Sequence, residues 1–141
     1  MFTLKIKRLH QDAVIPHYAL PGDVGLDVHS LEDMSVSPGE HVRLYTGFAM
    51  EFPHGYAAIV KDKSSISKAK LHTMGGVFDA GYRGEYNIHL VNLGDTTYEI
   101  KKGDKIAQIV MLPVAVPTIE EVTELSESER GEGSFGSTGR H

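Results

Sequence analysis

Apolar and polar residues alternate with a period of two along much of the chain. Near the N-terminus Phe2, Leu4 and Ile6 alternate with polar residues, and Ile88 and Leu90 stand between polar neighbours. A longer set of apolar residues in the middle of the chain occupies even-numbered positions before and after a turn: Val42, Leu44, Phe48, Met50 and Phe52. Successive side chains of a β-strand point to opposite faces, so this pattern predicts half-buried strands.

Two apolar runs, at 57–60 and at 106–112, where Gln108 is the one polar residue, predict fully buried strands. Turn-forming pairs that contain Gly or Pro recur between these segments, as at Pro21-Gly22 and Gly103-Asp104. Short strands separated in this way favour an all-β fold, either a sandwich or a closed barrel.

Helical signals are weak. The segment 64–71 predicts one or two helical turns behind a serine cap, whereas 119–125 is ambiguous between helix and strand. Neither segment sustains a helical period, so the prediction for the fold class stays all-β.

The chain has 141 residues, the size of one domain, with 40% hydrophobic and 23% charged residues. A net charge of −5 argues against nucleic acid or an anionic membrane as the partner. No apolar run has the length of a membrane span or of a signal-peptide core, so we expect a cytoplasmic protein. Cysteine is absent, which excludes disulfides and thiolate chemistry.

The last sixteen residues, SESERGEGSFGSTGRH, differ in kind from the rest. They contain many Gly and Ser residues and one large apolar side chain, Phe135, so they cannot form a core. We therefore expect a core at 1–125 and a mobile C-terminal arm at 126–141. On composition alone the arm is either an unstructured terminus or a phosphate-wrapping segment whose aromatic residue stacks on a base.

Four internal segments hold polar residues that plain strands do not need: PGDVGLDVHS at 21–30, KDKSSIS at 61–67, GGVFDAGYRG at 75–84 and GDKIAQ at 103–108. Each also has an ordinary structural interpretation. These are an Asx turn, a helix cap, a hairpin turn with an exposed Asp79, and a satisfied core amide at Gln108. The eight histidines lack an HExxH spacing, and no GxSxG is present.

Taken together and in this order, the five segments resemble the five motifs of the trimeric deoxyuridine triphosphatases (dUTPases). The resemblance extends from Pro21 to Gly139, and RGEGSFGSTG is its most specific part. It implies a distorted jelly-roll β-barrel of the β-clip type and a homotrimer with three active sites shared between subunits. It also implies hydrolysis of dUTP to dUMP and pyrophosphate with Mg²⁺, which limits uracil incorporation into DNA and supplies dUMP for dTMP synthesis.

The resemblance also assigns roles to residues of the third segment. Asp79 matches the aspartate that takes a proton from the water attacking the α-phosphorus. Tyr82 matches the aromatic residue that packs on the deoxyribose and excludes a 2′-hydroxyl. The hairpin around Thr73, Gly76 and Phe78 would bind uracil, largely through backbone groups.

The other motifs imply phosphate and metal contacts. Asp27 matches an acidic residue that reaches Mg²⁺ through water, while the triphosphate holds the metal itself. The phosphate chain would be held by Lys63, Ser64, Ser65 and Gln108. In the arm, Phe135 would stack on uracil, and the γ-phosphate would be clasped by Arg130, Gly136, Ser137 and Thr138.

Several positions depart from the common motifs. Lys63 stands where arginine is usual, Asp62 where proline is frequent, and Thr73 where an asparagine often contacts uracil. Phe78 replaces a smaller aliphatic residue, and Ser134 replaces a glycine. None of these departures removes a central catalytic group.

Two alternative functions use the same fold. An RSSxxR segment is typical of dCTP deaminases, which share this barrel, but no arginine lies between residues 61 and 81 here. A regulatory module that binds protein partners is the other alternative, and the intact Asp79 and arm argue against a purely non-catalytic form of it.

Overall fold

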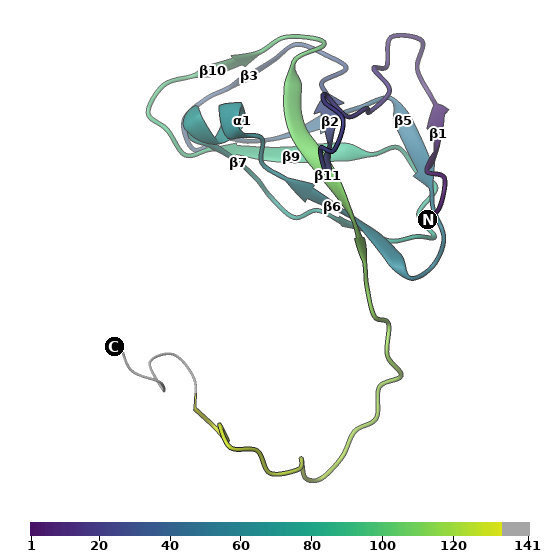
Figure 1. Cartoon of the computed structure of the whole chain (residues 1–141). Helices are drawn as coiled ribbons and strands as arrows, with labels where there is room; N and C mark the ends of the chain where they lie inside the picture. The colour runs from purple at the N-terminus through teal and green to yellow at the C-terminus, as the bar shows by residue number, and fades with distance from the viewer. Residues whose placement is uncertain (134–141) are drawn as a thin grey trace.

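The structure is a computed structural model that describes residues 1–133. It contains eleven strands and one short helix, in the order β1 Lys5–Arg8, β2 Gly25–His29, β3 Met34–Val36, β4 His41–Tyr45, β5 Phe48–Glu51, β6 Tyr56–Lys61, α1 Ser64–Lys68, β7 Leu71–Thr73, β8 Val77–Phe78, β9 Asn87–Asn92, β10 Tyr98–Ile100 and β11 Lys105–Pro113. The all-β prediction is confirmed (Figure 1).

Two antiparallel sheets form most of the body. One has the strand order β2-β11-β6-β8, and the other has the order β4-β9-β7. Two further pairs, β1-β5 and β10-β3, lie beside them. Neighbouring strands of a sheet are often distant in the sequence, as in a jelly roll, although the four sheets do not close into one continuous barrel.

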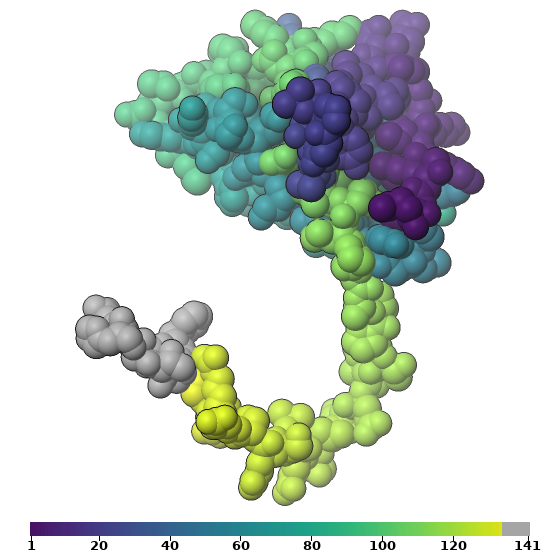
Figure 2. Space-filling model, in the orientation of Figure 1, coloured from purple at the N-terminus to yellow at the C-terminus, as the bar shows by residue number. Residues whose placement is uncertain are grey.

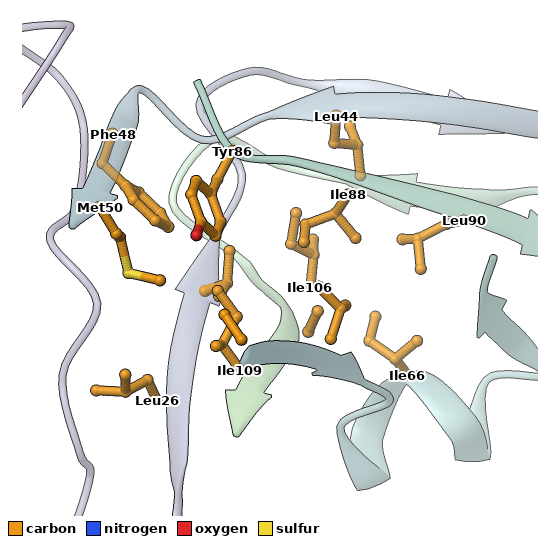
Figure 3. Close-up of a cluster of buried hydrophobic side chains, with 14 of the residues drawn as sticks. Leu26, Leu44, Phe48, Met50, Ile66, Tyr86, Ile88, Leu90, Ile106 and Ile109 are labelled. Carbon is orange, nitrogen blue, oxygen red and sulfur yellow. The ribbon is translucent and has the colours of Figure 1, made fainter. Parts of the chain in front are cut away.

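The hydrophobic core lies between the two larger sheets. Leu44 and Ile88 come from the β4-β9-β7 sheet, and Ile106 and Ile109 come from β11 (Figure 3). The period-two set in the middle of the chain is buried as predicted. Both apolar runs form central strands, β6 and β11, because each of these strands pairs with a neighbour on both sides.

The helical predictions need correction. Helix α1 ends at Lys68, and its cap position is Lys63, with no side-chain cap hydrogen bond, so the predicted serine cap is wrong. The single buried residue of α1, Ile66, anchors it on the core. The segment 119–125 forms neither helix nor strand, because its exposed apolar side chains pack against nothing among residues 1–133.

After β11 the chain leaves the body. The Val114 N–H donates to Gly55 O at 2.9 Å, and the following residues then curve away from the sheets (Figures 1 and 2). Ile119 is 93% exposed and Leu125 is 88% exposed. Within residues 1–133 the structure has no helix with the length and apolar character needed to cross a membrane.

Candidate active site

A buried carboxylate with two lysines forms the first part of the site. Asp27 is 2% exposed on β2, and its strand pairing places it beside Gln108 of β11, which in turn pairs with Lys61 of β6. Oδ1 of Asp27 accepts a hydrogen bond from Lys63 Nζ at 2.5 Å, and Lys105 Nζ lies 3.2 Å from Oδ2. Three sequence-distant segments therefore converge on one carboxylate.

The two ammonium groups keep this carboxylate ionised. Burial works to raise the pKa of Asp27, but the nearby Lys63 and Lys105 outweigh it and lower the pKa below its ordinary value. The Lys105 contact is an ion pair without hydrogen-bond alignment, so buried Oδ2 has no hydrogen-bond partner among residues 1–133. An acceptor oxygen of this kind suits a water molecule from the shell of Mg²⁺.

Sequence reasoning missed two neighbours of Asp27. Lys105 lies within the GDKIAQ segment, but only its pairing across from His29 reveals its contact with the carboxylate. His29 is buried and stacks on His17, with 5.7 Å between ring centroids. Burial, and then His17, lower the pKa of His29, which favours the neutral ring. Both residues lie within the polar segments at 21–30 and 103–108, but no pattern in the sequence singled out either one.

The segment after β6 lies next to this cluster. Ser64 and Ser65 are exposed in the first turn of α1, directly after Lys63. Gln108 is half-buried, and its Nε2 donates to Asp62 O at 2.9 Å, which satisfies the amide. A Cβ on Gly25 would lie 2.0 Å from Gln108 Oε1, so any larger residue there would displace the end of this side chain. Exposed hydroxyls, ammonium groups and an amide together suit an anionic phosphate chain.

The second part of the site is the segment from β7 to the turn after β8. It is not the predicted β-hairpin, because β7 pairs with β9 and β8 pairs with β6, but it is called the hairpin below. Gly76 O accepts a hydrogen bond from Val60 N–H at 2.9 Å, which holds the hairpin against β6. A hollow of about 510 Å³ lies here, and its lining includes Met74, Gly76, Phe78 and Asn87. That volume is in the range that accommodates a small ligand.

Asp79 and Tyr82 follow β8 in a tight turn. Tyr82 N–H donates to Asp79 O at 3.2 Å, and the Tyr82 hydroxyl donates to Glu85 O at 2.8 Å. The Tyr82 ring lies 5.5 Å from Phe78 and 5.7 Å from Tyr86, centroid to centroid. These contacts fix the ring while leaving the Asp79 side chain exposed, where water reaches it.

Within one chain the two parts lie at different levels of β6, although Asp62 contacts both, because it accepts hydrogen bonds from Thr73 N–H and from the Gln108 amide. Lys61 pairs with Gln108, whereas Ala58 pairs with Phe78. Three residues along β6 separate the two levels by about 10 Å. The anion-binding group of Asp27, Lys63, Ser64, Ser65 and Gln108 is therefore distinct from the hairpin group of Thr73, Gly76, Phe78, Asp79 and Tyr82.

Arg130, the remaining predicted site residue that the structure describes, lies in the arm. Its Nε donates to Gly133 O at 2.8 Å, and it is exposed. The segment after β11 that carries it extends away from the body (Figure 2). Four predicted site residues lie outside the described residues, namely Phe135, Gly136, Ser137 and Thr138. The departure at Ser134 also lies outside them.

Direct metal ligation by the protein alone has no basis in residues 1–133. No group of three or more His, Asp or Glu side chains is placed there to hold a metal ion.

Comparison with known proteins identifies the family. The model of the dUTPase family matches residues 11–139, a range that includes all five polar segments. The chain belongs to the dUTPase family. It is 44% identical over 142 residues to the deoxyuridine 5′-triphosphate nucleotidohydrolase of Clostridium tetani, covering 99% of this chain and 98% of that protein. The enzyme of the same name from Clostridioides difficile is also 44% identical, with 99% of both chains covered.

Solved structures agree with this assignment. A mutant dUTPase of Staphylococcus bacteriophage 80alpha, in complex with dUpNHpp, has a TM-score of 0.93 and 31% identity, with 99% of both chains covered. A mutant dUTPase of phage phi11 of S. aureus, described with a structural Mg(II) ion, has a TM-score of 0.84 and 27% identity over 89% of this chain and 100% of that chain. The chain is thus a dUTPase-type hydrolase with a dUTPase fold, and the deaminase alternative is not supported.

Proposed function

We propose that this dUTPase-family enzyme hydrolyses dUTP to dUMP and pyrophosphate, with Asp79 as the base and a site shared between subunits of a homotrimer. The observation that carries the proposal is the family match over residues 11–139, which contains both residue groups described above. The exposed Asp79 carboxylate is free to accept a proton from water.

The chemical step transfers the α-phosphoryl group to water. Asp79 removes a proton as the water oxygen bonds to the α-phosphorus, and the bond to the α,β-bridging oxygen breaks in line. Pyrophosphate leaves with the electron pair of that bond. Ser64, at the first turn of α1, donates a hydrogen bond to the leaving oxygen, and Lys63 and Gln108 orient the phosphate chain.

Mg²⁺ is the proposed cofactor. Asp27 is the residue that fits it, because buried Oδ2 accepts no aligned hydrogen bond and would receive one from a metal-bound water. When bound, the ion neutralises charge on the triphosphate oxygens. Lys63 and Lys105 hold the Asp27 carboxylate in place for this contact.

Substrate selection belongs to the hairpin group. Thr73 and Gly76 offer backbone hydrogen bonds to uracil, and the fixed Tyr82 ring packs on the deoxyribose so that a 2′-hydroxyl has no room. Close packing of the hairpin around the base likewise excludes the methyl group of thymine by steric clash.

A homotrimer with shared sites is supported by the segment after Pro113, which carries exposed apolar side chains at Val116, Ile119 and Leu125. A neighbouring subunit would bury them. We assign residues 126–141 as the arm that closes a neighbour's site, with Arg130, Gly136, Ser137 and Thr138 on the γ-phosphate and Phe135 on the base.

The test measures pyrophosphate release from dUTP, dCTP, dTTP and UTP with Mg²⁺. We expect release from dUTP alone, and a decrease of about 10²–10⁴-fold in kcat for Asp79→Asn, because a positioned base contributes a factor of that size. The affinity for dUpNHpp should change little.

The matched control is Asp95→Asn, which alters an exposed carboxylate in the loop between β9 and β10. It should retain wild-type turnover. Undiminished release by Asp79→Asn would contradict the assigned base, and ammonia released from dCTP would restore the deaminase alternative.

A further inference from the structure

The ring of Tyr82 is held in place chiefly at its hydroxyl end. Tyr82 is 38% exposed, so packing surrounds only part of the ring. Its hydroxyl donates to Glu85 O at 2.8 Å. The hydroxyl also lies close over Gly84, because a Cβ on that glycine would come within 2.5 Å of it. The position of the ring therefore depends on the position of residues 84 and 85.

The side chain of Glu85 attaches this segment to the turn between β4 and β5. Its Oε2 accepts a hydrogen bond from Gly47 N–H at 2.9 Å. Gly47 is buried, so its N–H has little access to water if the carboxylate is removed. The turn is tightly packed, since a Cβ on Gly47 would lie 2.7 Å from the Cβ of Ala13. Glu85 is thus bound to a well-packed part of the body.

The peptide group after Glu85 is bound to β5. Glu85 C=O and Tyr86 N–H belong to one planar peptide group, and the Tyr86 N–H donates to Phe48 O at 2.9 Å. With this bond alone, the peptide group could still pivot about the line from Tyr86 to Phe48. The Glu85 side chain adds a second attachment point and opposes that movement, so it fixes the carbonyl that receives the Tyr82 hydroxyl.

We propose that Glu85 is a positioning residue that determines how strongly Tyr82 excludes a 2′-hydroxyl. This inference rests on the proposed function, because it takes the Tyr82 ring as the surface that packs on the deoxyribose. A steric wall rejects a larger substrate only as strongly as the wall resists displacement. Gly47, Tyr82 and Glu85 belong to one chain, so this attachment is the same whichever subunit supplies the phosphate contacts.

Loss of the Glu85 side chain should change substrate selection more than it changes the chemical step. UTP carries the 2′-hydroxyl that the ring excludes, so a ring that yields would admit UTP, whereas dUTP needs no such movement. The exposed Asp79 side chain takes part in neither hydrogen bond of Glu85, so proton transfer to it should change little.

The experiment measures kcat/KM for dUTP and for UTP with the full chain and Mg²⁺, at enzyme concentrations that make slow release from UTP measurable. For Glu85→Ala we expect the ratio of dUTP to UTP to fall about tenfold, chiefly through faster hydrolysis of UTP, given the usual worth of a hydrogen bond to a charged group. Glu85→Gln keeps an oxygen that can accept from Gly47 N–H, so its ratio should stay within about threefold of wild type.

Glu40→Ala is the matched control. Glu40 Oε1 also accepts a backbone N–H, from Ser37 at 2.8 Å, but it precedes β4 and lies at the opposite end of that strand from Gly47. Its removal should leave the ratio unchanged. A lower Tm with an unchanged ratio in Glu85→Ala would overturn the inference in favour of a purely structural role. Equal falls in Glu85→Gln and Glu85→Ala would overturn it in favour of the charge itself.

A double variant tests whether Glu85 acts through Tyr82. Tyr82→Phe keeps the ring and removes the hydrogen bond to Glu85 O, so the ratio should fall in this variant as well. Adding Glu85→Ala to Tyr82→Phe should then lower the ratio little further, because two changes that break one connection are not additive. Fully additive losses would overturn the inference.

The proposed function fails in a different way. If the wild type did not favour dUTP over UTP, the proposed function would fall and this inference with it. If the wild type favoured dUTP and Glu85→Ala favoured it equally, the inference alone would fall.

Discussion

The buried hydroxyl of Tyr86 destabilises the fold because it lacks a hydrogen bond within residues 1–133, and the packing of the Tyr86 ring offsets this loss. Its side chain is fully buried and stacks on Phe78 and Phe48, with centroid distances of 4.1 and 5.5 Å. Its hydroxyl has no hydrogen-bond partner among residues 1–133. Burial, followed by a smaller effect of Tyr82, raises the pKa of Tyr86 to about 12. The aromatic ring therefore stabilises the fold, whereas the hydroxyl does not.

We expect Tyr86→Phe to leave the free energy of unfolding unchanged or to raise it by up to about 1 kcal/mol, because a buried unpaired hydroxyl is removed and the ring is kept. Urea denaturation at pH 7 tests this. Tyr98→Phe, which alters a half-buried tyrosine of β10, is the matched control. A loss above about 1 kcal/mol in Tyr86→Phe would mean that the hydroxyl has a partner in solution.

The same residue predicts a pH dependence. Above about pH 10 the unfolded state gains from ionising Tyr86, while the folded state resists ionisation until about pH 12. Because the folded pKa is the higher one, stability is present in full below pH 10 and is lost as the pH rises through this window. The free energy of unfolding, measured from pH 9 to 12, should therefore fall less steeply for Tyr86→Phe than for the wild type.

At the scale of the element, the hairpin depends on very few backbone contacts. Strand β8 has two residues, which pair with Ala58 and Ile59 of β6. Gly76 allows the close approach, since a Cβ there would lie 2.9 Å from the Cβ of Val60. Neither atom can move without shifting a strand, so glycine at 76 determines how closely the hairpin packs on β6.

Gly76→Ala should push the hairpin away from β6, lowering the free energy of unfolding by about 1–3 kcal/mol, as overpacking commonly does. Binding of dUpNHpp should weaken in parallel, because Asp79 and Tyr82 move with the hairpin. Chemical denaturation and calorimetric titration measure the two effects. Gly81→Ala, where a Cβ would meet no atom within 4 Å, serves as the control and should change neither.

At the scale of the whole molecule, the two residue groups and the arm determine how the site is completed. If the site is shared between subunits, two inactive variants carrying different defects should restore activity when mixed. We would combine Asp79→Asn with a chain truncated after residue 125. In randomly mixed trimers about a quarter of the sites would receive an intact hairpin and an intact arm from different chains, and the rate should rise accordingly.

The control for mixing is Asp79→Asn combined with Tyr82→Ala, since both defects lie in the same hairpin and no mixed site could be intact. Absence of recovery with the truncated chain, in samples whose subunits are shown to exchange, would indicate that one chain supplies the whole site. Sedimentation would establish the number of subunits in the same samples.

The sequence by itself determined the strands and the chemistry. Val42, Leu44 and Phe48 are buried because their alternation is a local property of an extended chain, and the order of the polar segments was sufficient to indicate the dUTPase family. Local patterns failed at 119–125, where the described residues 1–133 offer the apolar side chains no packing partner.

Only the tertiary structure decided which polar residues meet. The contacts of Asp27 with Lys63 and Lys105, and of Asp62 with Thr73, join residues 11 to 78 positions apart. They depend on the strand order β2-β11-β6-β8 and on the path of the chain from β6 to β7. Strand order and register between distant segments are chosen by the packing of the whole core, because any two alternating strands satisfy the same local pattern. For that reason the family resemblance was enough to assign Asp79 and Gln108 to the predicted site, whereas the contacts of Asp27 and Asp62 became visible only in the fold.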